Sequence, residues 1–263
     1  MKHNKKIFLF DMDGTLTPPR LQVEGNIIRA LRKLSQYTKI GIVTGSDMEY
    51  VEQQMMRAFD IGGVPVNSVD ILPCNGTKRY VATKSNRFSL DQEVNMIKEI
   101  GSDSYRKIVK FCLESQAEIV SKYEELPYTG TFLQYRGSLL NWCPIGRSAD
   151  QHQREQLVKL DHETSFRDLY AKSLRGLLLT LEIPVTVALG GSTSLDIYPD
   201  GWDKTYSMKY YEGWDVYFAG DRCEEGGNDW HIYEKLKDQG RSFSVESTDD
   251  TIRIIEEFIA GLS

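Results

Sequence analysis

One stretch of the sequence decides the fold, and it reads Lys6-Ile7-Phe8-Leu9-Phe10-Asp11-Met12-Asp13-Gly14-Thr15-Leu16-Thr17. Its apolar first half is typical of a buried parallel strand, and this strand ends at two carboxylates, Asp11 and Asp13. Ligands of open α/β sheets bind beyond the carboxyl ends of the strands, so we expect both acids to lie where chemistry is done. Two neighbouring acids repel each other unless a proton or a cation lies between them. A hard divalent cation, Mg²⁺, suits such oxygen ligands.

An ionised and oriented Asp11 is also a competent nucleophile toward a phosphoryl group. The plain alternative is a strand followed by an Asp-rich turn that has no catalytic role. Asp-x-Asp-Gly occurs in calcium loops as well, but those loops carry a Glu at position twelve. Counted from Asp11, that position is Gln22, and an apolar strand precedes the acids. Both observations favour a catalytic site.

The order of predicted elements indicates an α/β fold. Apolar strands over about 38–43 and 71–76 alternate with helices, which is typical of a doubly wound parallel sheet. From Arg79 the pattern changes to hairpins and helices. From Gly201 the alternation of apolar strands with helices returns. We therefore expect a discontinuous core, residues 1–84 and 201–263, with an α+β cap inserted over 85–200. Its expected elements are a hairpin over 80–89, helices over 91–100 and 103–123, a second hairpin over 131–143, a long helical region over 149–181, and strands over 185–189 and 194–198.

Composition limits the range of functions. The chain has 263 residues, enough for two domains or for one domain with a large insert, and a net charge of −6. This charge gives no reason to expect nucleic acid or an anionic membrane as partner. No apolar run reaches the length of a membrane span, and the N-terminus lacks a signal-peptide core, so we expect a cytosolic protein. Four scattered cysteines indicate neither a zinc site nor a disulfide framework.

Three further positions fall at expected strand ends or helix starts. Lys204 would neutralise phosphoryl charge and keep Asp11 ionised, and Asp221 would share Mg²⁺ with Asp11. A strand-end hydroxyl, Thr44 or Ser46, would donate to a phosphoryl oxygen. The structural alternatives are a solvated lysine at position 204 and a helix cap at Asp221. For Asp47 the sequence leaves two alternatives, a cap of the following helix and a catalytic role.

The residues in this order resemble the haloacid dehalogenase superfamily, and more narrowly its eukaryotic-type phosphomannomutases. The resemblance covers essentially the whole chain. The segments that carry it are Phe10 to Thr17 with Arg20, Gly45-Ser46-Asp47, Pro73 with Asn75-Gly76, Gly130-Thr131-Phe132, Arg136 with Leu140-Asn141, Pro144-Ile145-Gly146-Arg147-Ser148, Gly190-Gly191 with Ser194 and Asp196, Pro199-Asp200-Gly201-Trp202-Asp203-Lys204-Thr205-Tyr206, and Gly226-Gly227-Asn228-Asp229.

The resemblance implies an isomerase of GDP-mannose biosynthesis. It would interconvert mannose 6-phosphate and mannose 1-phosphate, and glucose phosphates too, with a hexose 1,6-bisphosphate as intermediate and activator. Asp11 would take the phosphoryl group. Asp13 would act as general acid and base and give its backbone carbonyl to Mg²⁺. The resemblance implies that the second phosphate and the sugar are held by Arg20, Arg136, Asn141, Arg147, Arg154, Ser194 and Asp196. Guanidinium forks suit this task because they grip phosphate bidentately.

Family members commonly form homodimers through the cap, and only the resemblance carries that expectation to this chain. The sequence also departs from the family's usual residues, at Thr44 for Gly, Cys74 for Glu, Cys143 for Ser, and Arg222-Cys223 for Lys-Thr. Thr44-Gly45 looks more like the phosphatase branch of the superfamily. Two alternatives therefore stand beside the mutase: a sugar-phosphate phosphatase, and a non-catalytic sugar-phosphate sensor, which the intact acids disfavour.

Overall fold

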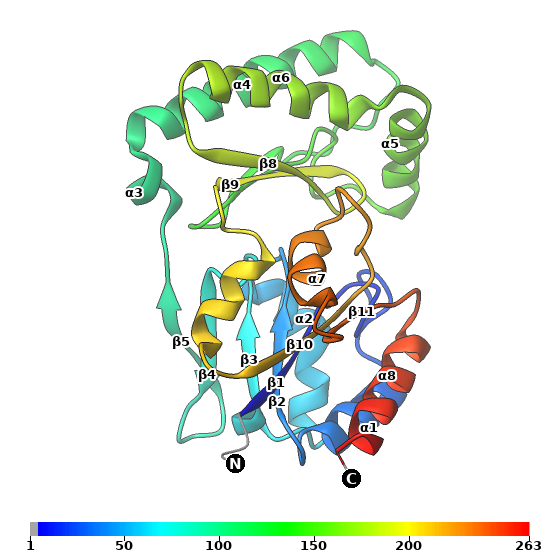
Figure 1. The fold of residues 1–263 in the computed structure, drawn as a ribbon. Coiled ribbons are helices and arrows are strands. Elements are labelled where there is room, and N and C mark those ends of the chain that lie inside the picture. Colours follow the sequence, from blue (N-terminus) through cyan, green and yellow to red (C-terminus); the bar gives the residue numbers. More distant parts are fainter. Residues whose placement is uncertain (1–4, 263) are drawn as a thin grey trace. The chain divides into compact units, whose positions relative to one another are not determined.

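The computed structural model describes residues 5–262, and the chain divides into two compact units. Unit 1 comprises Met1–Glu93 and Trp202–Ser263, and unit 2 comprises Val94–Gly201. Figure 1 shows the elements of both units. Within the described residues, no helix combines the length and the apolar character needed to cross a membrane.

Unit 1 is built on a seven-stranded sheet in the order β11-β10-β1-β2-β3-β4-β5. The first five strands in this order pair in parallel, whereas β4 and β5 are antiparallel. The strands span Lys6–Phe10 (β1), Lys39–Val43 (β2), Val69–Leu72 (β3), Lys78–Ala82 (β4), Phe88–Glu93 (β5), Asp215–Gly220 (β10) and Ser242–Ser244 (β11). Its helices are α1 (Gly25–Leu34), α2 (Met48–Asp60), α7 (Trp230–Lys237), α8 (Thr248–Ala260), a one-turn 3-10 helix (Val66–Ser68) and a longer 3-10 helix (Lys204–Tyr211), which is the one called the 3-10 helix below.

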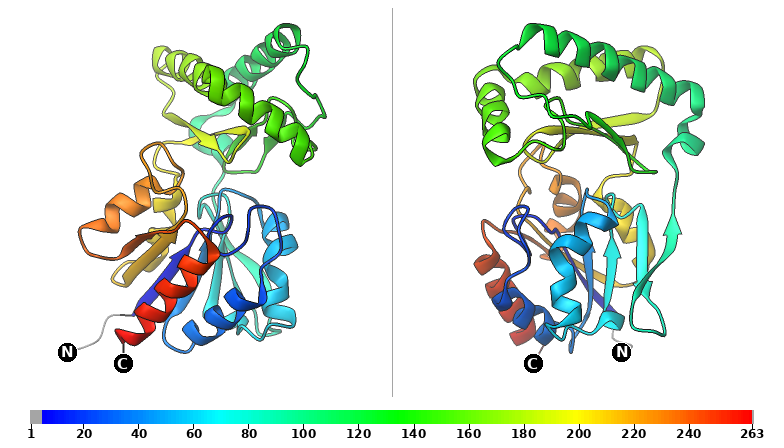
Figure 2. Two further views of the ribbon diagram at one scale, coloured as in Figure 1. Left: turned by 90° about the vertical axis from the view of Figure 1, so that its right-hand side faces the viewer. Right: turned by 180° about the vertical axis from the view of Figure 1, so that it is seen from behind.

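Side chains of β1 alternate between two apolar cores because successive residues of a strand point to opposite faces of the sheet. Phe8 and Phe10 pack with α1, α2 and α8 on one face. Ile7 and Leu9 pack with α7 and the 3-10 helix on the other. The left view of Figure 2 shows α7 and α2 on opposite sides of this sheet. The doubly wound α/β core predicted from the sequence is therefore confirmed.

Unit 2 holds a four-stranded antiparallel sheet in the order β6-β7-β9-β8. Its strands are β6 (Leu133–Tyr135), β7 (Leu140–Trp142), β8 (Val185–Gly190) and β9 (Ser194–Pro199), and its helices are α3 (Met96–Ile100), α4 (Ser102–Lys122), α5 (Gln151–Thr164) and α6 (Phe166–Thr180). Trp142 of β7 packs edge-on against Phe111 of α4 and Tyr170 of α6. One face of the sheet is therefore covered by helices, and the insert has the predicted α+β composition.

Two element boundaries differ from the sequence-based expectations. Residues 91–93, predicted as the start of a helix, continue β5 because they pair with β4 as far as Lys78 and Glu93. The expected division at residue 84 therefore falls inside the β4–β5 hairpin, and unit 1 extends to Glu93. The helical region predicted over 149–181 is two helices, because Ser165 between them adopts a left-handed conformation with φ of 54°.

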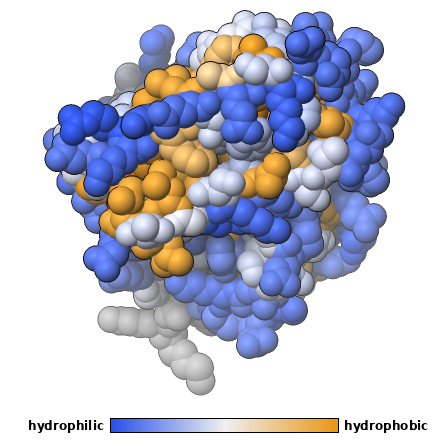
Figure 3. Space-filling model, turned by 90° about the horizontal axis from the view of Figure 1, so that it is seen from above, coloured by the Kyte–Doolittle hydropathy of each residue, from blue (hydrophilic) through white to orange (hydrophobic). Residues whose placement is uncertain are grey.

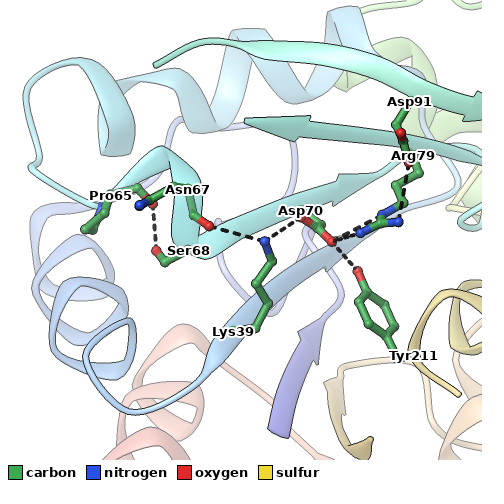
Figure 4. A network of polar contacts seen from close by, with 8 residues as sticks. All are labelled: Lys39, Pro65, Asn67, Ser68, Asp70, Arg79, Asp91 and Tyr211. Atoms are coloured by element: carbon green, nitrogen blue, oxygen red, sulfur yellow. Dashed lines mark hydrogen bonds and ion pairs between the residues drawn. The ribbon is translucent and has the colours of Figure 1, made fainter. Parts of the chain in front are cut away.

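A buried carboxylate links four strands of unit 1 to its 3-10 helix (Figure 4). Asp70 of β3 is fully buried and lies 2.8 Å from the ammonium of Lys39 on β2 and 2.9 Å from the guanidinium of Arg79 on β4. The Tyr211 hydroxyl, at the end of the 3-10 helix, donates to Asp70 at 2.8 Å. Arg79 also reaches Asp91 of β5 at 3.4 Å. The network fixes the far end of the helix that begins at Lys204.

Replacing Asp70 with Ala is expected to lower the free energy of unfolding by about 3 kcal/mol, because it leaves partly buried cations without their anion. Chemical denaturation monitored by fluorescence measures this change. The control is Asp91→Ala, whose carboxylate makes the more exposed contact with Arg79 and should contribute less than about 1 kcal/mol. Equal destabilisation by the two variants would contradict the importance of the buried carboxylate.

Candidate active site

Asp11 lies directly beyond the carboxyl end of β1, beside the end of β10. Its amide donates to the carbonyl of Ala219 at 2.9 Å, which continues the parallel ladder between the two strands by one residue. Because β10 ends at Gly220, Asp221 leaves its strand next to Asp11. The pairing of two strands from opposite ends of the sequence thus brings two acids together.

Lys204 lies between two buried carboxylates. Its side chain is 1% exposed, and its ammonium donates to Oδ1 of Asp11 and, at 2.5 Å, to Oδ1 of Asp229. Burial alone lowers the pKa of a lysine, but the charges of Asp11 and Asp229 outweigh burial and raise the pKa of Lys204. Lys204 therefore provides a permanent positive charge at the end of β1 and is not a solvated lysine.

Sequence reasoning misses Asp229 because it directly precedes α7 and reads as a helix cap. In the structure its side chain makes no capping bond. The residue is fully buried, and its Oδ2 accepts a hydrogen bond from the Arg222 amide at 3.0 Å while Oδ1 accepts from Lys204. One sequence signal could have indicated a site role for Asp229: it is an acid that follows the same strand as Asp221 and comes shortly after it.

Three acids lie close together here and only two of them contact Lys204, so the donor set fits a hard divalent cation. Oxygens of Asp11, Asp221 and Asp229 lie within 4.8 Å of one another. Burial raises the pKa of Asp11 well above its ordinary value against the opposing charge of Lys204, and burial, then the charge of Asp229, raises that of Asp221. Buried oxygens of Asp221 and Asn228 accept no hydrogen bond from the described residues. Acceptors without donors in a region of excess negative charge suit a cation with oxygen ligands.

Gly14 permits the close approach of Asp221. Its φ is +83°, and a Cβ atom placed there would lie 2.4 Å from Oδ2 of Asp221. Both the left-handed backbone and the lack of space require glycine at this position. The turn that follows Asp13 is therefore shaped around Asp221, the acid that follows β10.

The turn after β3 helps to position the helix of Lys204. Cys74, Asn75 and Gly76 all have positive φ, which folds the chain back sharply. The Asn75 amide donates to the carbonyl of Trp202 at 3.3 Å, and a Cβ atom on Gly76 would lie 2.6 Å from the Cβ of Ser207. The tight turn thus rests directly on the 3-10 helix, and Cys74 is buried within it.

The residues after β2 have local partners. The hydroxyl of Thr44 accepts a hydrogen bond from the Ser46 amide at 3.1 Å, and Thr44 is buried whereas Ser46 is half-buried. Asp47 caps α2, because its carboxylate accepts from the Tyr50 amide at 3.2 Å. The structural interpretation of Asp47 as a helix cap is therefore confirmed.

Asp13 is half-buried, and its carboxylate turns toward the loop that follows β1. Its Oδ1 accepts a hydrogen bond from the backbone amide of Arg20 at 2.8 Å. Arg20 itself is exposed. The backbone of Arg20 thus contacts Asp13 directly, whereas a substrate role was expected of its side chain.

In unit 2, a row of polar side chains crosses the face of the sheet opposite the helices. The strand register places Gln134 opposite Asn141, and Asn141 opposite Asp196. The Asn141 amide donates to Asp196 at 2.7 Å, and Ser194 lies two residues earlier on β9, so it shares this face. Polar groups aligned across three strands form a surface suited to a ligand that carries hydroxyl groups.

Three arginines adjoin this row. The Arg136 guanidinium donates to Gln134 at 3.2 Å, and that of Arg147 donates to Asn141 at 3.2 Å. Arg154 is 8% exposed, and three of its nitrogens donate inside the protein, to the carbonyls of residues 147 and 149 and to the Thr193 hydroxyl. Arg154 therefore supports the loop that carries Arg147.

The structure sorts the predicted residues into two sets. The first set lies in unit 1 and includes Asp11, Asp13, Arg20, Thr44, Ser46, Lys204 and Asp221. The second set lies in unit 2 and includes Arg136, Asn141, Arg147, Arg154, Ser194 and Asp196. Of the first set, Asp11 and Lys204 are in direct contact and Asp221 adjoins them.

Comparison with known proteins identifies relatives along most of the chain. Residues 27–261 match the family model described as eukaryotic phosphomannomutase. Phosphomannomutase from Arabidopsis thaliana is 34% identical over 94% of this chain and 93% of its own length. Phosphomannomutase from Encephalitozoon cuniculi is 33% identical over 97% of this chain and 94% of its own length.

Solved structures show the same fold. An IMP-bound mutant of the IMP-nucleotidase from Plasmodium falciparum aligns with a TM-score of 0.68 over 98% of this chain and 67% of its own, at 12% identity. A trehalose-6-phosphate phosphatase related protein aligns with a TM-score of 0.52 over 97% of this chain and 98% of its own, at 14% identity. At such low identity these likenesses support the haloacid dehalogenase-like fold and not a substrate.

Magnesium chloride is expected to raise the melting temperature of the protein if the acid cluster holds a cation. At 100 times its Kd, a ligand that binds only the folded state adds about 2.7 kcal/mol of stability. The shift should be strongly reduced in Asp221→Asn, and Asp91→Asn serves as a control away from the cluster. An undiminished shift in Asp221→Asn would show that the cation binds elsewhere.

Proposed function

Since the chain belongs to the eukaryotic phosphomannomutase family and is an enzyme, we propose that it interconverts mannose 6-phosphate and mannose 1-phosphate through an aspartyl-phosphate and a hexose 1,6-bisphosphate. The observation that carries the proposal is the buried contact of Asp11 with Lys204 at the end of β1. It supplies an oriented carboxylate beside a fixed cation, as phosphoryl transfer to a carboxylate requires. Glucose phosphates, which share the geometry of the phosphate ester, are included as substrates.

Asp11 is the proposed nucleophile, and the charge of Lys204 opposes the effect of burial on its carboxylate and would balance phosphoryl charge. Asp13, two residues further on, exchanges the proton of the sugar hydroxyl. Asp11, Asp221 and the backbone carbonyl of Asp13 would hold Mg²⁺, and Asp229 adds a carboxylate that sequence reasoning did not include. When bound, Mg²⁺ would stabilise the negative charge that develops on the phosphoryl oxygens. The Thr44 and Ser46 hydroxyls would donate to the same oxygens.

A mutase needs a second cationic binding site, or seat, for phosphate because the sugar carries two phosphates in the intermediate. We assign this seat to Arg136 and Arg147, which lie on the polar face of the unit 2 sheet, with Arg20 contributing from unit 1. Asn141, Ser194 and Asp196 would contact the sugar hydroxyls. Unit 1 is accordingly the proposed catalytic core and unit 2 the proposed specificity cap.

A sugar-phosphate phosphatase would use the same first step, with water attacking the aspartyl-phosphate. The family match over residues 27–261 favours the mutase. One assay separates the two: purified protein with mannose 1-phosphate and Mg²⁺, with and without hexose 1,6-bisphosphate, following both 6-phosphate and free phosphate. Bisphosphate-dependent formation of mannose 6-phosphate is the expected result. Release of phosphate alone would establish the phosphatase.

Asp11→Asn is expected to abolish isomerisation, with a loss of more than about 10³-fold in kcat. An amide cannot attack phosphorus, and it is a poor ligand for a cation. The rate of mannose 6-phosphate formation measures the effect. Turnover close to that of the wild type would rule out an aspartyl-phosphate at this residue.

Arg147→Ala is expected to weaken use of hexose phosphates by about 1.5–3 kcal/mol, because a charge-assisted contact to the second phosphate is lost. Transfer from acetyl phosphate to Asp11 should stay intact, since acetyl phosphate has no second phosphate to hold. Arg154→Ala should also lower the melting temperature, because this guanidinium supports the loop around residues 147–149. If Arg147→Ala leaves isomerisation unchanged, the proposed seat is wrong.

We also propose a cytoplasmic protein that supplies mannose 1-phosphate to GDP-mannose biosynthesis and forms a homodimer through unit 2. All four cysteines are buried, and the described residues contain no disulfide, as is usual in a reducing compartment.

Apolar side chains are exposed on α4, at Leu113 and Val120, and on α6, at Leu169 and Leu179. Figure 3, which views the molecule from the side of these helices, shows apolar residues gathered among hydrophilic ones. Sedimentation of the wild type and of Leu113→Glu tests the dimer.

A further inference from the structure

Three donors converge on one oxygen of Asp13. Its Oδ1 accepts from the Arg20 amide at 2.8 Å, from the Tyr50 hydroxyl at 3.3 Å and from the Gln54 side-chain amide at 3.4 Å. Within the described part of the chain, no hydrogen bond reaches Oδ2. The two longer contacts are of the kind that tighten when substrate binds. The two carboxylate oxygens therefore have different surroundings.

Two of the donors come from one face of α2. Tyr50 and Gln54 are four residues apart, so their side chains lie one above the other on the helix. Gln54 is 3% exposed, and the Thr17 hydroxyl donates to its Oε1 at 2.8 Å. Because an ionised carboxylate only accepts hydrogen bonds, the nitrogen of Gln54 is the atom that points at Asp13, and its Oε1 faces Thr17. Asp47 fixes the start of the same helix.

The third donor is presented by a strained turn. Leu21 donates to the carbonyl of Pro18 at 3.0 Å, with Pro19 and Arg20 at the two central positions. Arg20 has φ of 65°, a left-handed conformation that a type II turn requires at its third position and usually fills with glycine. Such strain costs about 1–3 kcal/mol, and it tends to occur at functional sites. Here it accompanies an amide aimed at Asp13.

Tyr50 keeps its proton under ordinary conditions. Burial raises the pKa of its phenol, and the charge of Asp13 raises it further. The hydroxyl is therefore a donor to the carboxylate.

We propose that Tyr50 and Gln54 are positioning residues that hold Oδ1 of Asp13 against α2 and leave Oδ2 as the oxygen that exchanges a proton with the substrate. The inference rests on the proposed function, since it names the groups that orient its general acid. When the bond between phosphorus and the leaving oxygen breaks and the bond from phosphorus to Asp11 forms, the proton on Oδ2 moves to that leaving oxygen. In the reverse direction Oδ2 takes the proton back.

The test compares two small phosphate donors that differ in their need for a proton. Phenyl phosphate has a basic leaving group that needs protonation, whereas 4-nitrophenyl phosphate has a much less basic one. In Tyr50→Phe and in Gln54→Leu, the rate with phenyl phosphate should fall about tenfold or more, and the rate with 4-nitrophenyl phosphate should fall less. The ratio of the two rates should change most in Asp13→Asn, which removes the general acid itself. Gln53→Leu, an exposed neighbour on α2, should leave both rates unchanged.

The primed isomerisation of mannose 1-phosphate should fall in kcat by a similar factor, with little change in KM. Equal slowing with both aryl donors, or an unchanged ratio, would overturn the inference. So would a crystal structure of the wild type in which Tyr50 and Gln54 do not contact Asp13, whatever the turnover. Failure of the proposed function is a separate result, because it appears as a wild type that isomerises no hexose phosphate.

Discussion

The ion pairs of Lys204 with Asp11 and Asp229 hold the site of this protein together. They join the end of β1, the start of the 3-10 helix and the segment before α7, and Lys204 and Asp11 are 193 residues apart in the sequence. Removing one partner from a buried pair of this kind leaves an uncompensated charge, at a cost of about 3–5 kcal/mol. The first and last parts of the chain must therefore fold together around the inserted unit. The ion pair of Lys204 with Asp11 thus joins the two sequence segments of the discontinuous core.

Much of the fold could be predicted because local sequence and tertiary structure agree. Ile7 to Phe10 are all apolar since both faces of β1 are covered, and this signal is visible in the sequence. The break at Ser165 could not be seen, because no Gly or Pro marks it. There the carboxylate of Asp161 accepts hydrogen bonds from the amide and the guanidinium of Arg167, both at 2.7 Å. The same guanidinium donates to the carbonyl of Gly191 at 2.9 Å, so the break also has a contact with a distant part of the sequence. The extent of β5 likewise depends on pairing with β4.

The candidate site could be predicted where its residues follow strands, as Asp11 and Asp221 do, because parallel strands end at one edge of a sheet. Asp229 was hidden by its position before a helix, where an acid usually serves as a cap. Tyr50 and Gln54 were hidden for a different reason. They lie inside a helix, and only its placement shows that one polar face meets the acid after β1. The supporting position of Arg154 also depends on loops that sequence alone does not place.

Unit 1 has two buried acidic sites, Asp70 and the group of Asp11, Asp221 and Asp229, and they differ in how their charge is compensated. Asp70 is matched by two cations and a tyrosine hydroxyl, so its charge is compensated within the protein. Asp11 and Asp229 share one lysine, and a buried oxygen of the neighbouring Asp221 has no donor among the described residues. Burial without compensation is unfavourable unless something else completes the site. Asp70 therefore stabilises the sheet, whereas the excess negative charge of the three acids beyond the strand ends is compatible with a bound cation.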